Sequence, residues 1–173
     1  MSQSVLIVYT TKYGSTHQVA LAVTSTLQEV GFEVEFKPAK AVEELGSYDA
    51  VVVATALYMG RLHGDARRFL TRSRKELSEK PVALLVLGPI DDVAKNWNGA
   101  RNQLRKELAK LPWFTPVVQE LFGGRFDPES LGFPLNLIPP LRKMPANDCR
   151  DWAAIRSWVA GPVAQAFQGV CVP

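Results

Sequence analysis

The sequence predicts an α/β fold in which helices cover both faces of a parallel sheet, and two observations support this prediction. Residues 5–9, 50–54 and 82–87 are uniformly apolar runs rich in β-branched side chains. Such runs are typical of strands that are buried on both faces, as parallel sheets require. Segments of helical periodicity alternate with these runs, which implies parallel pairing through right-handed crossovers. We therefore expect a three-layer sandwich around a five-stranded parallel sheet.

The first helix and the strand after it are marked by their periodicity and by the residues that end them. From Thr16 onward, apolar residues recur every three to four positions, and Gly31 follows as a helix C-cap would. Residues 32–37 then alternate between apolar and charged, which predicts a half-buried strand nearer the edge of the sheet. Pro38 closes this strand.

The same alternation continues to residue 122 and then stops. The remaining predicted elements are helix 66–77, strand 82–87, helix 100–111 and strand 117–121. Residues 122–150 break the pattern, and we interpret them as an insertion before a closing helix that begins near Asp151. Because domains usually contain about 100–200 residues, we expect residues 1–173 to form a single domain.

The composition indicates a globular protein from a reducing compartment. Apolar residues make up 47% of the chain and charged residues 21%, which is ordinary for a globular domain. The two cysteines, Cys149 and Cys171, argue against a disulfide scaffold. The first residues include no basic stretch, and their apolar run is too short for a signal peptide or a membrane span. We therefore expect a cytoplasmic protein.

The loop after the first strand is crowded with small hydroxyl side chains. In YTTKYGSTHQVA, the residues Thr10, Thr11, Ser15 and Thr16 surround Gly14 just before the first helix. A helix N-terminus presents unpaired N–H groups, and glycine lets a backbone close around an anion. The loop therefore predicts a phosphate site, the alternative being an ordinary capped helix start. Neither common glycine-rich nucleotide loop is present.

At this loop the chain resembles the flavodoxins. Their signature has two apolar residues, an aromatic residue and then T-x-x-G-x-T, and the matching positions are Ile7, Val8, Tyr9, Thr11, Gly14 and Thr16. The resemblance implies a flavodoxin-like fold with strand order 2-1-3-4-5. It also implies that the loop holds the phosphate of FMN. The loop residues so implicated are Thr10, Thr11, Lys12, Tyr13, Gly14, Ser15 and Thr16.

The resemblance further implies that the loops after the third and fourth strands hold the flavin ring. The residues concerned are Thr55, Ala56, Leu57, Tyr58, Met59 and Gly60 in one loop, and Leu87, Gly88, Pro89 and Trp97 in the other. Tyr58 is the candidate to stack on the ring, since an aromatic face suits it, or else it is a loop aromatic packed on the core. Trp97 is a candidate for the other face, with simple packing as the alternative.

No side chain is assigned as a catalytic acid or base, and no metal site is expected. Lys12 and His17 either contact the phosphate or are exposed to solvent. His63 either lies near the flavin as a polar contact or bonds locally at a helix start. Asp91 and Asp92 are interpreted as a solvated loop. Two histidines without a nearby cysteine do not suggest a metal centre.

The charge of the chain sets it apart from typical flavodoxins, which are acidic and dock on basic partners. The formal net charge is +3, and basic side chains gather over 61–80 and 101–110. A basic surface suits an acidic redox partner, an anionic substrate or an anionic membrane face, although each run also fits an ordinary solvated helix face. No nucleic-acid partner is expected, because no recognised motif is present.

A closer resemblance is to the menaquinone-dependent protoporphyrinogen oxidases, a flavodoxin-like branch. Tyr58, Gly60 and His63 match Y-x-G-x-x-H, and Asp151-Trp152 match the start of that branch's last helix. The branch also has an insertion after strand five, here residues 122–150. This resemblance implies an FMN-dependent oxidoreductase that acts on a tetrapyrrole or a quinone, with peripheral contact at the inner membrane face.

The insertion itself leaves two interpretations open. Its five prolines preclude one long helix, and they are Pro128, Pro134, Pro139, Pro140 and Pro145. The apolar residues within 131–141 are either buried against the fold or exposed as a docking surface for a partner, a membrane or a second subunit. The functional alternatives to an oxidoreductase are a flavodoxin-type electron carrier between proteins and a domain that has lost flavin and serves only for interaction.

Overall fold

A parallel sheet of five strands forms the centre of the computed structural model, which describes residues 2–169; Cys171 lies outside this range. The strands are β1 (Ser4–Tyr9), β2 (Glu33–Pro38), β3 (Ala50–Tyr58), β5 (Val82–Leu87) and β6 (Val118–Phe122). They are ordered β2-β1-β3-β5-β6, and every neighbouring pair is parallel. Counted along the chain, this is the predicted order 2-1-3-4-5, which is therefore confirmed.

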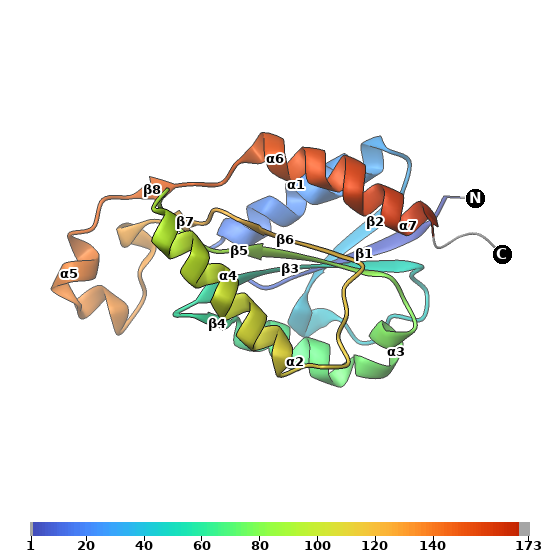
Figure 1. The fold of residues 1–173 in the computed structure, drawn as a ribbon, viewed down its shortest axis with the longest axis horizontal. Coiled ribbons are helices and arrows are strands. Elements are labelled where there is room, and N and C mark those ends of the chain that lie inside the picture. The colour runs from blue at the N-terminus through green and yellow to red at the C-terminus, as the bar shows by residue number, and fades with distance from the viewer. Residues whose placement is uncertain (1, 170–173) are drawn as a thin grey trace.

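Helices cover both faces of this sheet, as Figure 1 shows. On one face lie α1 (Ser15–Glu29), α6 (Trp152–Trp158), a π-helical segment η4 (Val159–Val163) and α7 (Ala164–Gly169). On the other face lie α2 (Gly64–Arg72), α3 (Arg74–Ser78) and α4 (Ala94–Ala109). Pro162 stands in the π-helical segment, so the closing helix changes its geometry there.

Each central strand contributes to two apolar cores because successive side chains point to opposite faces. Val5 and Ile7 of β1 pack toward α1 and α6, whereas Leu6 and Val8 pack toward α2. All four residues are fully buried. The uniformly apolar runs in the sequence are thus explained by burial on both faces.

The structure corrects several predicted boundaries. Pro38 belongs to β2, and Phe122 is the last residue of β6 rather than the first residue of the insertion. β3 continues past Ala54 to Tyr58 and turns back into β4 (Arg61–Leu62), to which it pairs in antiparallel fashion. The predicted helix 66–77 is divided at Ser73 into α2 and α3. The predicted helix 100–111 begins earlier, at the start of α4. A short 3-10 helix η1 (Ala39–Ala41) follows β2.

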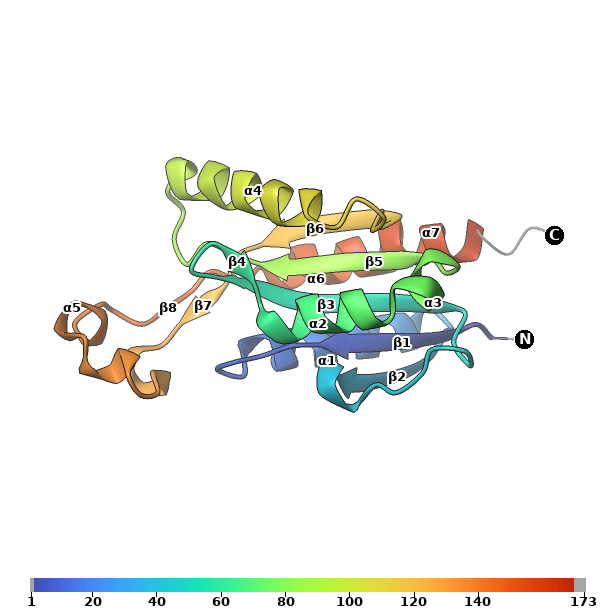
Figure 2. The same cartoon turned by 90° about the horizontal axis from the view of Figure 1, so that it is seen from below.

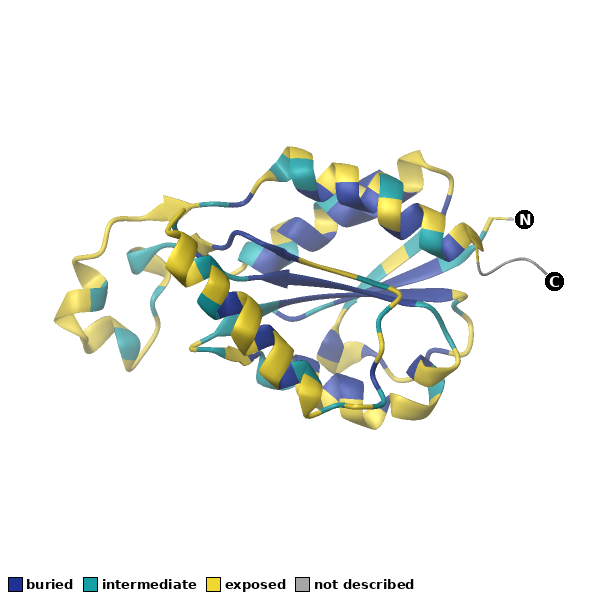
Figure 3. Ribbon diagram, in the orientation of Figure 1, coloured by how far each residue is buried: buried dark blue, intermediate teal, exposed yellow. Residues whose placement is uncertain are grey.

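The insertion forms a lobe that projects beyond the carboxyl ends of the strands (Figure 2). It contains β7 (Arg125–Phe126), η2 (Pro128–Ser130), η3 (Leu135–Leu137), α5 (Pro139–Arg142) and β8 (Asn147–Asp148). β7 and β8 form a two-stranded antiparallel ladder at its base. Figure 3 shows that most of the lobe is exposed. Within residues 2–169, none of the helices has the length and apolar character needed to cross a bilayer.

Candidate functional site

A cavity of about 310 Å³ lies at the carboxyl ends of β1, β3 and β5. This is the end of an open parallel sheet where ligands bind. All residues from Thr10 to Thr16 except Gly14 line it, as do Ala56, Leu57, Tyr58, Met59, Leu87 and Gly88. The remaining predicted contacts, Thr55, Gly60, Pro89 and Trp97, are not part of its lining. Residues of the insertion form another part of the lining.

The loop before α1 leaves several donors without a partner. Gly14, at φ 86, is the N-cap residue of α1, and no side chain caps the helix. Thr11 Oγ1 accepts the Gly14 N–H at 2.8 Å, while the Thr10 and Thr55 hydroxyls pair with each other at 2.8 Å in the core. In the described part of the chain, the hydroxyls of Ser15 and Thr16 have no hydrogen-bond partner. Two of the four predicted hydroxyls therefore stabilise the fold, and two remain for a ligand.

A cation and two phenols meet on another wall of the cavity. The Tyr13 and Tyr58 hydroxyls lie 3.4 Å apart, and Lys12 Nζ lies 4.1 Å from the centre of the Tyr58 ring. The hydrogen bond to Tyr58 raises the pKa of Lys12. Burial favours the neutral phenol of Tyr58, but its hydrogen bonds with Tyr13 and Lys12 outweigh burial and lower its pKa. Lys12 is exposed to solvent, but its ammonium group lies over an aromatic face.

His63 bonds locally at a helix start, and it also lines the cavity. Its Nδ1 accepts the Asp65 N–H at 3.2 Å and so caps α2. Burial lowers the pKa of His63, against the opposing influence of the Asp65 carboxylate. The imidazole is consequently neutral at pH 7. His17, by contrast, contacts the Tyr9 ring at 5.0 Å and lies outside the cavity lining.

Trp97 takes part in packing in this structure. Its indole N–H donates to the Asp91 carbonyl at 2.9 Å, and its ring packs against the apolar core beneath α4. The Asp91 carboxylate accepts hydrogen bonds from Asn96 and from the Val93 N–H, which fits the interpretation of this segment as a polar loop. Gly60, at φ 78, permits the turn between β3 and β4.

Comparison with known proteins identifies the fold family. The family model described as a flavodoxin domain matches residues 6–135, more than half of the chain. The chain belongs to the flavodoxin family. Among curated protein sequences, none matches it.

Solved structures of flavodoxins share the fold over almost the whole chain. A cysteine-to-alanine mutant of flavodoxin from Pseudomonas aeruginosa is 20% identical, with a TM-score of 0.57 over 96% of this chain and 99% of its own. A flavodoxin from the domain Archaea is 11% identical, with a TM-score of 0.54 over 95% and 99% of the two chains. A mutant flavo di-iron protein from Thermotoga maritima is 14% identical and scores 0.55, over 96% of this chain and 36% of its own.

In this flavodoxin-family chain, the contribution of the insertion to the cavity was not predicted from the sequence. Arg125 and Asp127 line the cavity together with the apolar side chains of Leu131, Leu135, Ile138 and Leu141. One signal was present, namely the dipeptide Gly123-Gly124. A Cβ at Gly123 would lie 2.0 Å from the Cys149 carbonyl oxygen, so this glycine permits two distant segments to cross in close contact.

Proposed function

We propose that the chain is a flavodoxin-type protein that binds FMN and transfers electrons to a redox partner protein. The observation that carries this proposal is the uncapped start of α1, with the free hydroxyls of Ser15 and Thr16, at the ligand-binding end of the sheet. Helix N-termini of this kind bind phosphate groups. When bound, FMN supplies the redox chemistry, since it exchanges electrons singly or in pairs.

The residues around the cavity fit this cofactor. The first-turn amides of α1 and the hydroxyls of Ser15 and Thr16 would hold the phosphate, and Gly14 keeps the loop open around it. Tyr58 and Tyr13 offer aromatic surface for the flavin ring on the neighbouring wall. Lys12, which lies over Tyr58, adds a cation beside that aromatic surface. The residues between Ala56 and Met59 and the pair Leu87–Gly88 would border the ring.

A second candidate function is an FMN-dependent oxidoreductase that acts on a quinone or a tetrapyrrole, as in the protoporphyrinogen oxidase branch. It is favoured by the apolar wall that the insertion adds to the cavity, formed by Leu131, Leu135, Ile138 and Leu141. A flat apolar substrate would gain from burial against such a wall. An electron carrier that meets only other proteins has no need of this enclosure.

The exposed tip of the insertion supports a peripheral contact of the oxidoreductase with an anionic membrane face. Phe133 is 81% exposed and Leu137 65% exposed, and Arg142 and Lys143 follow within the same lobe. Apolar side chains flanked by cations are suited to such a surface. Sedimentation with vesicles of phosphatidylcholine and phosphatidylglycerol, compared with phosphatidylcholine alone, tests this contact. Association of two copies of the chain through the same tip would appear instead as a dimer in solution.

The test of cofactor binding is a titration of the flavin-free protein with FMN and with riboflavin, monitored by flavin fluorescence. Riboflavin lacks the phosphate, so its affinity reports the ring contacts alone. We expect FMN to bind about 100-fold more tightly or better, because several charge-assisted hydrogen bonds to the phosphate are involved. Equal affinities for the two flavins would contradict the proposal.

The two candidate functions differ in their use of the insertion. Replacing residues 131–141 with a short Gly-Ser linker removes the apolar wall and leaves α1 and its loop intact. If the chain is the oxidoreductase, the variant should retain FMN binding. The rate at which the reduced variant passes electrons to a menaquinone analogue should fall strongly. If the chain is an electron carrier, that rate should be the same in the variant and in the unaltered chain.

A further inference from the structure

The base of the insertion is fixed beside the loop that follows β5. In the β7–β8 ladder, Arg125 pairs with Asp148, and the next contact is a backbone hydrogen bond of 2.9 Å from the Cys149 N–H to the Gly124 carbonyl. The Gly124 N–H in turn donates to the Pro89 carbonyl at 2.7 Å. These backbone bonds set where the side chains of the ladder can reach.

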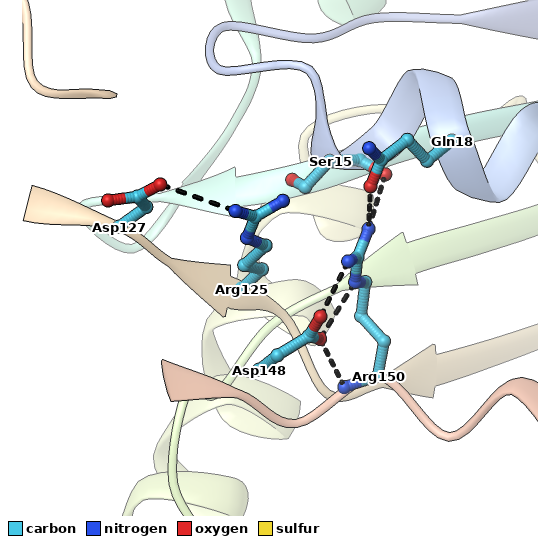
Figure 4. Close-up of polar contacts among 6 residues, drawn as sticks. All are labelled: Ser15, Gln18, Arg125, Asp127, Asp148 and Arg150. Carbon is cyan, nitrogen blue, oxygen red and sulfur yellow. Dashed lines mark hydrogen bonds and ion pairs between the residues drawn. The ribbon is translucent and has the colours of Figure 1, made fainter. Parts of the chain in front are cut away.

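A buried arginine connects this base to the first turn of α1 (Figure 4). The side chain of Arg150 is only 4% exposed and donates to both carboxylate oxygens of Asp148, at 2.8 and 2.6 Å. It also donates to Gln18 Oε1 at 2.7 Å and to the Ser15 carbonyl at 3.3 Å. The ladder is therefore held in a defined position relative to the residues that begin α1.

Arg125 projects from the same ladder toward the start of α1, where Ser15 lies (Figure 4), and both residues line the cavity. Within residues 2–169, its side chain donates a hydrogen bond to Asp127 Oδ2 at 3.2 Å. A guanidinium has five N–H donors, so most of its donors remain for a ligand. The side chain is 39% exposed, which leaves it hydrated and free to adjust.

We propose that Arg125 is a phosphate-binding residue of the FMN site, so that the insertion completes the cofactor site as well as enclosing it. This inference rests on the proposed function. The loop before α1 offers neutral amides and hydroxyls, and Lys12 is engaged over Tyr58. Arg125 adds the adjustable positive charge that a phosphate dianion attracts, in the planar geometry that binds two of its oxygens.

The variant Arg125→Gln tests this role, because it removes the charge from a partly exposed side chain and leaves the β7–β8 backbone unchanged. We expect FMN to bind about tenfold more weakly, the usual scale for loss of a charged hydrogen bond. Riboflavin affinity should stay within about twofold, since it has no phosphate to lose. Arg142→Gln is the matched control: it removes a cation from the same insertion, outside the cavity lining, and should alter neither affinity.

In a second variant, Asp127→Asn, we expect the opposite change in FMN affinity. It removes the carboxylate that pairs with Arg125 and lines the same cavity, while an amide oxygen can still accept the Glu129 N–H. FMN affinity should rise and riboflavin affinity should not change. An unchanged ratio of FMN to riboflavin affinity in Arg125→Gln, with the preference for FMN intact in the unaltered chain, overturns the role of Arg125 alone. No preference for FMN in the unaltered chain overturns the proposed function and this role with it.

Discussion

The cavity has two walls, and they are held in place by different forces. The first wall is formed at the carboxyl ends of sheet strands such as β1 and β5. The central side chains of these strands are fully buried in two apolar cores. The wall from the insertion consists of short elements with exposed tips, positioned by a two-stranded ladder and by the buried Arg150. Burial of apolar surface therefore positions the first wall, and a few polar contacts position the second. Changes in the sheet should unfold the protein, whereas changes in the insertion should alter the site and leave the fold.

Two phenylalanines provide the largest expected contrast. Phe69 in α2 is fully buried, whereas Phe133 in the insertion is 81% exposed. Phe69→Ala should lower the free energy of unfolding by about 3–5 kcal/mol, because it leaves a cavity in the core. Phe133→Ala should change it by less than about 0.5 kcal/mol. Urea unfolding measures both, and a large loss for Phe133→Ala would show that the tip is packed in solution.

The contact between the ladder and α1 should show an intermediate effect. Asp148→Asn removes the carboxylate from the buried Arg150 and should cost about 1–3 kcal/mol of unfolding free energy. Asp127→Asn, which disrupts the partly exposed pair with Arg125, should cost less than about 0.5 kcal/mol. Equal costs for the two variants in urea unfolding would mean that Arg150 does not anchor the insertion.

The pair of Asp148 and Arg150 should also make the free energy of unfolding depend on pH. Hydrogen bonds from Arg150 hold the pKa of Asp148 below its usual value. The stabilisation is therefore complete above the unfolded pKa of about 4 and is lost as the pH falls through the lower folded value. Between about pH 5 and 3, the unaltered chain should lose more stability than Asp148→Asn. Parallel pH profiles for the two proteins would contradict this assignment.

His63 gives the smallest expected effect, and it acts near neutral pH. Burial lowers its pKa, so the folded state resists a proton that the unfolded state accepts below about pH 6.5. The unfolding free energy of the unaltered chain should therefore fall as the pH decreases from about 7 to 5. In His63→Gln this part of the decrease should be absent. Thermal unfolding at a series of pH values measures the difference, and identical slopes would show that His63 protonates equally in both states.

The sheet was predictable from the sequence because its signals are local and periodic. The apolar run at 5–9 and the helical spacing after Thr16 both report burial directly, and the strand order followed from the resemblance of the first loop to flavodoxins. The hairpin between β3 and β4 was not predicted because its turn places Met59 in the left-handed region, at φ 48. Methionine is not a residue type that indicates such a turn in a sequence.

The second wall was not predictable, since the contacts that place it join residues far apart in the chain. The bond between Arg150 and Gln18 spans 132 positions and leaves no periodic trace. The prolines correctly indicated that no long helix would form in the insertion. They did not indicate on which side of the sheet the insertion would pack. The dipeptide Gly123-Gly124 was the signal for close packing, since a Cβ at either glycine would clash with the backbone of Cys149 or of Gly88.

The central claim is that the open start of α1 holds the phosphate of FMN, and two glycines of matched geometry test it most directly. Gly14 and Gly31 both have positive φ, at 86 and 99, and a Cβ at either position would meet nothing within 4 Å. Valine is strained at either position, but only Gly14 lies in the proposed phosphate loop, so the dissociation constant of FMN separates the two variants. Gly14→Val should weaken FMN binding about tenfold to 100-fold, because the strained loop would have to leave its phosphate-binding conformation. Gly31→Val should change the dissociation constant of FMN by no more than about threefold. If both variants bind FMN as tightly as the unaltered chain, the phosphate is held elsewhere and the account is wrong.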